Sequence, residues 1–283
     1  MCDNRFSIAE AAWCPGCGNF EIIAALKSAL EQLGKKPHEV LLAAGIGQAA
    51  KTPQYLNANG FCGLHGRSLP PAAAAKIVNK ALTVIVDTGD GDSYGEGGNH
   101  FLHNIRRNVD ITHFVHNNQI YALTKGQASP TSDLKMVTEV QPSGSMHEPL
   151  NPVLLAISLG AGFVARAFSG DREQLTSIMK EAINYKGYAL VDILQPCVTF
   201  NKTNTFQWYN KRVYKLADDY DASDRLKAME KAMEWGDRIP TGILFRQDKP
   251  DFHDKLEFLK SGGSLVDRPF ELEKVKAYMN DFK

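Results

Sequence analysis

The sequence predicts an α/β fold, in which a parallel β-sheet is covered by helices on both faces. Short apolar runs rich in β-branched residues and bounded by Gly or Asn recur along the chain and are typical of buried strands. Longer segments with a helical spacing of apolar residues lie between these runs. Strands that alternate with helices form parallel sheets with both faces covered, and such sheets bind ligands at the carboxyl ends of their strands.

Five strands are expected, and polar motifs follow several of them. The second strand is followed at once by Gly-Asp-Gly-Asp at residues 89–92, and the third ends at the Asn-Asn pair 117–118. A further short strand is expected before Leu-His-Gly-Arg at residues 64–67. The five strands are predicted at residues 40–46, 82–88, 111–116, 162–168 and 188–194. The motifs therefore occupy the edge of the sheet where this fold binds its ligands.

Four helices are expected between these strands. Residues 19–33 carry an apolar stripe, and residues 70–79 open with a Pro pair, which the first turn of a helix tolerates. Residues 96–107 and 171–186 also suit helices, and Asp171 is a suitable N-cap for the last one.

Composition narrows the function classes. The chain has 283 residues, 23% of them charged, and a formal net charge of zero, which argues against nucleic-acid binding and against binding to a membrane surface. No apolar run approaches the ~20 residues of a membrane span, and the N-terminus is polar, so we expect a cytoplasmic protein. Five cysteines, an odd number, favour metal or redox chemistry over disulfides in that compartment.

The strongest motif pairs Gly89-Asp90-Gly91 with the Asn pair that ends the next strand. This spacing resembles the signature of thiamine-diphosphate enzymes. A diphosphate needs a divalent cation, and Mg²⁺ prefers hard oxygen ligands, which the Asp90 carboxylate, the Asn118 amide and the Ile120 carbonyl can supply. Gly89 and Gly91 let the backbone approach the phosphates. The alternative is a solvated Asp-Gly turn beside an unrelated Asn pair.

Further residues are assigned to the same cofactor site. His65 and Arg67 can donate hydrogen bonds to diphosphate oxygens, and Gly66 lies between them. Asp92 completes the Gly-Asp-Gly-Asp motif and is placed with them. The alternative is a surface histidine and an arginine in a salt bridge.

Several motifs together resemble the β subunit of 2-oxoacid:ferredoxin oxidoreductases, over roughly residues 5–245. They are Trp-Cys-Pro-Gly-Cys-Gly-Asn at 13–19, Leu-His-Gly-Arg at 64–67, Gly-Asp-Gly-Asp at 89–92, Arg-Arg-Asn-Val-Asp at 106–110, the segment 121–131, Gln-Pro-Cys at 195–197, the segment 201–214 and Trp-Gly-Asp-Arg-Ile-Pro at 235–240.

The resemblance implies a division of labour. This subunit would bind thiamine diphosphate, Mg²⁺ and one [4Fe–4S] cluster, while an α subunit supplies the glutamate that activates the cofactor. The pair, as an α₂β₂ assembly, would oxidatively decarboxylate pyruvate or 2-oxoglutarate, pass electrons to ferredoxin and transfer the acyl group to coenzyme A. Residues 1–200 would form the cofactor domain with an N-terminal loop of cluster ligands. Residues 201–283 would form an extension that packs on the domain or on a partner subunit.

The cluster ligands depart from the family pattern. Cys14 and Cys17 form a two-ligand hairpin, and Cys197 matches the distal ligand of the family. The family usually carries a fourth cysteine in a Gly-Ile-Gly-Cys segment, but this chain has Gln48 there, and an amide is a poor ligand for iron–sulfur chemistry.

Cys62, just before the Leu-His-Gly-Arg segment, is the predicted replacement for the missing ligand. Alternatively, Cys62 is a small buried hydrophobic residue, and the cluster is lost or has only three cysteine ligands. Cys2 lies near the terminus and is assigned no role.

Three residues are expected near the substrate through the resemblance. Lys51 matches a lysine beside the substrate carboxylate, and Leu123 and Lys125 match a loop that borders the pocket. Two other functions stay open: a thiamine-dependent decarboxylase or transferase without electron transfer, which Gln48 favours, and a non-catalytic assembly subunit.

Overall fold

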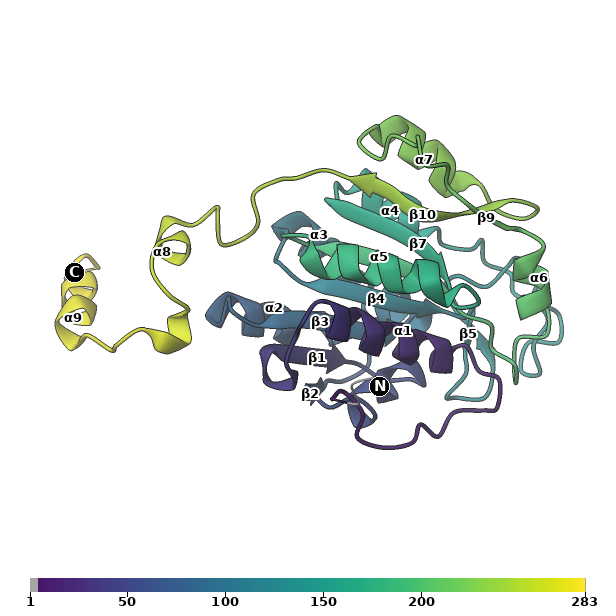
Figure 1. Ribbon diagram of the computed structural model, residues 1–283, viewed down its shortest axis with the longest axis horizontal. Coiled ribbons are helices and arrows are strands. Elements are labelled where there is room, and N and C mark those ends of the chain that lie inside the picture. Colours follow the sequence, from purple (N-terminus) through teal and green to yellow (C-terminus); the bar gives the residue numbers. More distant parts are fainter. Residues whose placement is uncertain (1–4, 283) are drawn as a thin grey trace.

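The structure, a computed structural model, describes residues 5–282 and is built on one eight-stranded sheet (Figure 1). The strand order is β2-β1-β3-β4-β8-β7-β10-β9. The strands are β1 Val40–Ala44, β2 Asn59–Cys62, β3 Thr83–Gly89, β4 Thr112–Asn117, β7 Phe163–Phe168, β8 Ala189–Leu194, β9 Val213–Lys215 and β10 Ile239–Arg246. All five predicted strands are confirmed, as is the short strand β2 before the Leu-His-Gly-Arg segment.

The predicted sheet is parallel except at one edge, where two further strands join it. Strand β10 pairs with β7 in antiparallel orientation, and β9 then pairs with β10 in parallel. Pro240 and Gly242 interrupt the strand pattern of β10, and the register shifts between Ile243 and Phe245. Proline and glycine weaken a strand signal and mark irregular pairing, so the sequence pattern does not predict this edge.

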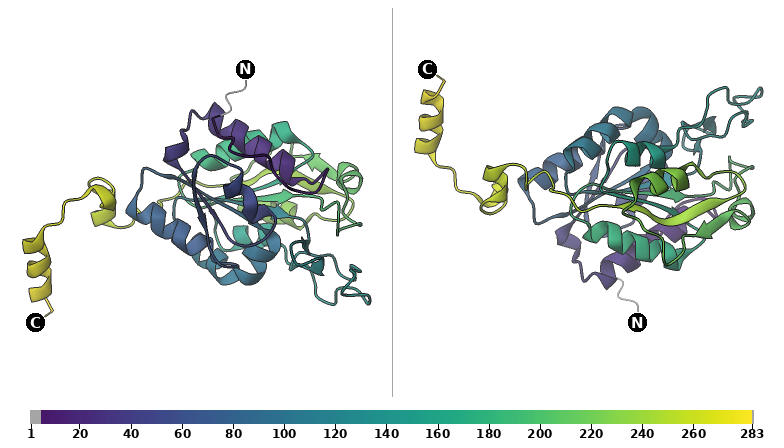
Figure 2. Two further views of the ribbon diagram at one scale, coloured as in Figure 1. Left: turned by 90° about the horizontal axis from the view of Figure 1, so that it is seen from below. Right: turned by 90° about the horizontal axis from the view of Figure 1, so that it is seen from above.

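Helices cover both faces of the sheet (Figure 2). Helices α1 (Asn19–Gln32) and α5 (Arg172–Asn184) pack together on one face. The other face carries α2 Leu69–Val78, α3 Gly98–Arg107, α4 Pro152–Ser158 and α7 Arg225–Met233. Each face has its own cluster of buried apolar side chains. Asp171 caps α5 as predicted, since its carboxylate accepts a hydrogen bond from the Gln174 amide.

The remaining elements are short. They are the hairpin of β5 (Ile120–Tyr121) and β6 (Gln127–Ala128), α6 Phe206–Asn210, α8 Glu257–Lys260, α9 Leu272–Asn280, three 3₁₀ turns at Pro37–Glu39, Ala49–Gln54 and Leu265–Asp267, and a π-helical turn at Gly91–Glu96. Of these, the hairpin and the π-helical turn matter most for the site, because they follow β4 and β3 at the carboxyl edge of the sheet.

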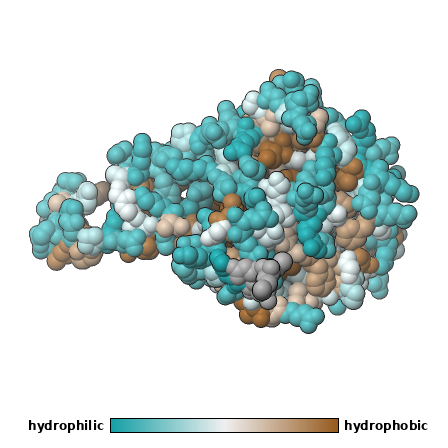
Figure 3. Space-filling model, viewed as in Figure 1, coloured by the Kyte–Doolittle hydropathy of each residue, from teal (hydrophilic) through white to brown (hydrophobic). Residues whose placement is uncertain are grey.

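The C-terminal segment projects away from the sheet (Figure 1). Helix α9 ends this arm, and apolar side chains such as Leu272 and Met279 are exposed on it. Figure 3 shows hydrophobic side chains along one edge of the arm, and further hydrophobic patches on the body of the molecule. Within residues 5–282, no helix has the length and apolar character needed to cross a membrane.

Candidate cofactor site and cysteine pocket

A pocket opens at the carboxyl ends of β1, β3 and β4. The predicted magnesium ligands Asp90, Asn118 and Ile120 all line it. Its other predicted lining residues are His65, Gly89, Gly91, Asp92 and Leu123. The strand ends thus bring together three motifs that lie far apart in the sequence, as the fold class implies.

Asp90 lies at the base of this pocket and is 1% exposed. Its Oδ2 accepts hydrogen bonds from Ser129 Oγ at 2.5 Å and from Thr131 Oγ1 at 2.7 Å. Burial raises the pKa of Asp90 to about 6, although the two hydroxyl donors act in the opposite direction. A carboxylate that is costly to ionise and fixed by two donors is suited to a bound cation, which offsets the cost of its charge.

Asn118 and Ile120 are brought together by the tight turn between β4 and β5. Gln119, between them, has a left-handed backbone with φ of 59°. The Asn118 Oδ1 accepts a hydrogen bond from the Ile120 amide at 3.0 Å. The Asn118 carbonyl accepts another from Asn201 Nδ2 at 3.1 Å, so the turn is tied to the segment that follows β8. An amide oxygen and a backbone carbonyl therefore lie on one short, fixed turn.

Asp92 ties three loops together at the rim of the pocket. Its Oδ1 accepts hydrogen bonds from the Ile46 amide at 3.0 Å and the Gly66 amide at 2.7 Å, and it lies 2.7 Å from His65 Nδ1. Burial raises the pKa of Asp92. Gly45 must lack a side chain, since a Cβ there would lie 2.0 Å from the Asp92 carboxylate. Asp92 therefore positions His65 at the pocket.

The glycines of the motif leave room for a bound group. A Cβ at Gly89 would meet no atom within 4 Å, so the backbone is open to the pocket there. A Cβ at Gly91 would lie 2.2 Å from the ring of Tyr121, which keeps the π-helical turn close to the β5 hairpin. Short π-helical turns are frequent at functional sites. The open backbone and the buried oxygen ligands fit a metal–diphosphate group.

Four predicted residues do not line this pocket. Arg67 is exposed and donates to the carbonyls of Gly66 and Glu96. Gly66 is buried below it with φ of 70°. Lys51 is half-buried in a 3₁₀ turn, and Lys125 is exposed in the β5–β6 loop. Their roles toward cofactor and substrate stay predictions.

Sequence reasoning gave no individual role to the residues that hold Asp90 in place. Thr131 Oγ1 lies 2.7 Å from Asp90 Oδ2 and 2.9 Å from Asn117 Oδ1. Asn117 Nδ2 in turn donates to both oxygens of Asp192, at 3.2 and 3.1 Å. Asp192 lies inside the apolar run of β8. Because a central parallel strand is buried on both faces, a carboxylate in such a run indicates a buried polar contact that the sequence alone can reveal.

A second pocket, which we call the cysteine pocket, lies beside the first. Cys14, Cys17 and Cys197 line it together with Gln48 and Trp13. These three cysteines thus line one pocket, and their shared role as cluster ligands stays a prediction. Trp13 Nε1 donates to the Gln48 carbonyl at 2.8 Å, which joins the loop after β1 to the cysteine loop.

Cys17 is the best described of the three thiols. Burial raises its pKa to about 11, and Gln195 Nε2 donates to its sulfur at 3.4 Å. Since iron binds thiolates, a metal that bound Cys17 would have to displace a tightly held proton.

Cys62 lies apart from these three thiols. It is exposed at the end of the edge strand β2 and does not line the cysteine pocket, where Gln48 is found instead. Cys2 lies outside the described residues. Over residues 5–282, no group of three or more His, Cys, Asp or Glu side chains is arranged to hold a metal ion. The predicted magnesium set, with one carboxylate, one amide and one carbonyl, is not a group of this kind. Cys14, Cys17 and Cys197 would be one, and the described residues do not hold them in a metal-binding arrangement, so their ligation of a cluster stays a prediction.

The chain has the fold of a thiamine-diphosphate enzyme. Residues 38–193, more than half of the chain, match the family model "Thiamine pyrophosphate enzyme, C-terminal TPP binding domain". Residues 197–261 match the family model for the C-terminal part of the pyruvate ferredoxin oxidoreductase beta subunit.

Relatives identify the family more closely. The chain is 44% identical to a 2-oxoacid:ferredoxin oxidoreductase subunit beta of Saccharolobus solfataricus, over 87% of this chain and 91% of the relative. It is 40% identical to the subunit beta of 2-oxoacid:ferredoxin oxidoreductase 1 of Aeropyrum pernix, over 93% and 86%. A solved 2-oxoglutarate:ferredoxin oxidoreductase from Magnetococcus marinus matches with a TM-score of 0.91 and 34% identity, over 97% of this chain and 94% of that chain.

The chain belongs to the family of 2-oxoacid:ferredoxin oxidoreductase β subunits, and it is therefore one subunit of an oxidoreductase that needs an α partner. The resemblance given by the sequence motifs is confirmed.

Proposed function

We propose that this chain binds thiamine diphosphate through a magnesium ion held by Asp90, Asn118 and the Ile120 carbonyl, and that the complex oxidatively decarboxylates a 2-oxoacid. The observation that carries the proposal is the buried Asp90 carboxylate, fixed by two hydroxyls in a pocket that Asn118 and Ile120 share. Magnesium prefers these oxygen ligands and keeps its remaining positions for phosphate and water.

Thiamine diphosphate, when bound, supplies an electron sink for the carbanion left by loss of CO₂. The residues of this chain bind and orient it. Ser129 and Thr131 hold Asp90 in place, and Asp92 fixes His65 at the rim, from which the imidazole can donate to a phosphate oxygen. Leu123, exposed on the β5–β6 loop and lining the pocket, would border the substrate.

Lys51 and Lys125 are proposed to act near the substrate carboxylate, although neither lines the pocket of the isolated chain. A cation near an anionic substrate contributes to binding. Arg67 and Gly66 would act at the periphery of the diphosphate. The α subunit would complete this half-site and supply the glutamate that activates the cofactor, in an α₂β₂ assembly.

The cysteine pocket is proposed to hold the [4Fe–4S] cluster through Cys14, Cys17 and Cys197. The fourth ligand of the cluster is not assigned to a cysteine. Gln48 lies in the pocket and Cys62 does not, which favours a cluster with a non-cysteine or open corner over ligation by Cys62. The cluster would carry electrons one at a time to ferredoxin, and coenzyme A would accept the acyl group.

The solved relative contains 2-oxoglutarate, coenzyme A and succinyl-CoA. These names support 2-oxoglutarate as the substrate here, with pyruvate as the alternative. We propose that the enzyme is cytoplasmic. Residues 1–200 are proposed as the cofactor domain, and residues 201–283 as an extension whose first part completes the sheet and whose arm reaches a partner subunit.

Co-expression with the α subunit tests the proposal. The purified complex should contain thiamine, iron and sulfide and should reduce ferredoxin with a 2-oxoacid and coenzyme A, whereas this chain alone should show no turnover. Decarboxylation by the lone chain would contradict the half-site. A colourless complex that decarboxylates without reducing ferredoxin would instead support the non-redox thiamine enzyme that Gln48 favours.

A further inference from the structure

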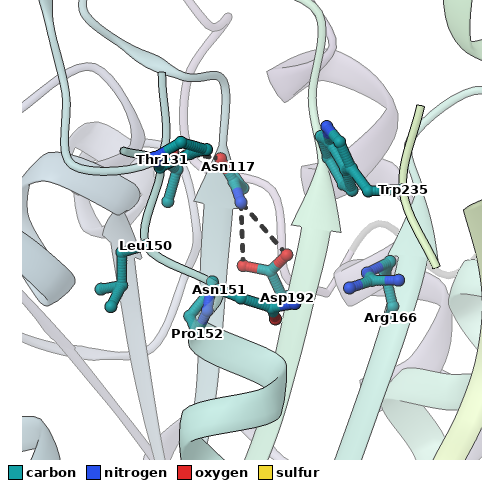
Figure 4. A pocket seen from close by; sticks show the side chains of 9 residues that line it. Asn117, Thr131, Leu150, Asn151, Pro152, Arg166, Asp192 and Trp235 are labelled. Atoms are coloured by element: carbon teal, nitrogen blue, oxygen red, sulfur yellow. Dashed lines mark hydrogen bonds between the residues drawn. The ribbon is translucent and has the colours of Figure 1, made fainter. Parts of the chain in front are cut away.

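A separate cavity of about 160 Å³ lies between the sheet and α4, and it shares no lining residue with the cofactor pocket. It is lined by Asn117, Thr131, Leu150, Arg166, Asp192 and Trp235, among others. Figure 4 shows these side chains around one space, with Asp192 between Asn117 and Arg166. A single water needs only about 10–15 Å³ of such volume, so a small polyatomic ligand fits.

Arg166 lies in the middle of β7, where a charged side chain is unusual because every residue of this strand is buried. It is 2% exposed, and its Nη2 donates to the Ala232 carbonyl at 3.2 Å. Its Nε and Nη1 are buried and have no hydrogen-bond partner among residues 5–282. An arginine stays protonated in proteins, so both nitrogens remain hydrogen-bond donors. Because a buried donor without a partner is costly in free energy, we expect a bound acceptor at Nε and Nη1.

The residues that line the cavity give Arg166 neither an acceptor for Nε and Nη1 nor an ion pair. Asp192 pairs with Arg166 in the register of β7 and β8, but no ion pair joins the two side chains in the described part of the chain. The Asp192 carboxylate accepts from Tyr94 and Asn117 instead, and burial raises its pKa. The ring of Trp235 lies 5.6 Å from the guanidinium and adds a weak cation–π contact.

We propose that this cavity is a binding site for a small oxyanion, such as a phosphate or a carboxylate, held by Arg166 Nε and Nη1. Water could satisfy the two donors, but an anion also balances the buried charge, which Asp192 compensates only from a distance.

The proposed site is linked to the metal ligand by a short chain of polar contacts. Asp192 accepts from Asn117, the Asn117 Oδ1 contacts Thr131 Oγ1, and that hydroxyl donates to Asp90. An anion that shifts Asp192 or Asn117 would therefore change the affinity of the magnesium site, and by thermodynamic reciprocity cofactor loading would change the affinity for the anion.

Selenate, an oxyanion with an anomalous X-ray signal, tests the proposal in the assembled oxidoreductase. Crystals of the complex, loaded with Mg²⁺ and thiamine diphosphate so that the cofactor site is filled, are soaked in selenate. The expected result is an anomalous peak in the cavity, with an oxygen within about 3 Å of Arg166 Nε or Nη1. A cavity that contains only water at saturating selenate overturns the proposal.

Equilibrium dialysis with radiolabelled inorganic phosphate gives the solution measurement. The complex carrying Arg166→Met should bind one phosphate fewer per β chain than the wild type. The complex carrying Arg246→Met, which removes a surface arginine paired with Glu181, should bind the wild-type number. Equal binding by wild type and Arg166→Met contradicts the proposal. If Arg166→Met does not fold, the wild-type crystal decides, and it does so whether or not the proposed cluster is present.

Discussion

The cofactor pocket and the cysteine pocket lie side by side and share Gln48, Asn118 and Ala122 in their walls, yet they are built differently. In the first, a buried carboxylate is fixed by two hydroxyls and surrounded by strand ends. In the second, three thiols come from two loops, one before α1 and one after β8, and Gln48 lines the pocket with them. The proposed oxygen ligands are thus positioned by hydrogen bonds within the chain, whereas no comparable set of hydrogen bonds fixes the three thiols in the described residues.

The largest expected effect is at Asp90. In the assembled complex, Asp90→Ala should weaken Mg²⁺-dependent binding of thiamine diphosphate by more than about 100-fold, because a direct ligand contributes more than the 10–100-fold of a supporting residue. Calorimetric titration of the complex measures this. Asp254→Asn, which removes a surface carboxylate paired with Lys186, is the matched control and should bind normally. Wild-type affinity in Asp90→Ala would falsify the assignment.

Cysteine variants test the second pocket in the same way. Cys17→Ser should lose most of the iron, because a central ligand in the pocket is removed, whereas Cys62→Ser should keep it if the fourth corner is not a cysteine. Iron and sulfide per β chain, with the EPR spectrum of the reduced complex, are the measurements. A matching loss of iron in Cys62→Ser would instead show that Cys62 moves into the site when the cluster assembles.

Thr131→Val sharpens the comparison, since it removes the hydroxyl that contacts both Asp90 and Asn117. Residues that support a metal ligand typically contribute about 10–100-fold in affinity, so the Mg²⁺ and thiamine diphosphate affinities should fall by that factor while iron content stays unchanged. Thr176→Val, whose hydroxyl bonds only to the Arg172 carbonyl within α5, is the control. A loss of iron in Thr131→Val would mean that the two pockets are not independent.

The pH dependence of cofactor binding follows from the raised pKa of Asp90, about 6 in the metal-free chain. Below that value the carboxyl holds a proton that Mg²⁺ must displace, so the apparent affinity should fall by up to about tenfold per pH unit from pH 6 downward and level off above it. Titrations between pH 5 and 8 at fixed ionic strength measure this trend. An affinity that does not change between pH 5 and 6 would show that another group binds the metal.

The sequence predicts the strand ends that form the site, but not the side chains that hold Asp90 in place. The strands ending at Gly89 and Asn117 follow from apolar runs with polar ends, and those ends meet because parallel strands share a carboxyl edge. The contacts of Asp90 with Ser129 and Thr131 depend on how a long loop folds back over the sheet, and no local pattern specifies that path. Burial of Arg166 likewise depends on β10, which pairs with β7 and which the sequence pattern does not predict.

The smallest expected effect concerns the one hydrogen bond that ties the loop after β1 to the cysteine loop. Trp13→Phe keeps an aromatic ring against Phe20 and Tyr55 but removes the donor to the Gln48 carbonyl. The loss of one such bond costs about 0.5–1.5 kcal/mol, so the thermal midpoint of the complex should fall by a few degrees, roughly as expected for a domain of this size. Trp208→Phe is the control, because that indole stacks on Arg212 and its N–H does not bridge the two loops. If Trp13→Phe also lowers iron content while Trp208→Phe does not, the position of Gln48 matters for the cluster. If both variants retain iron and only the thermal midpoint of Trp13→Phe falls, the position of Gln48 does not affect the iron content. That result is expected if three cysteines alone bind the cluster.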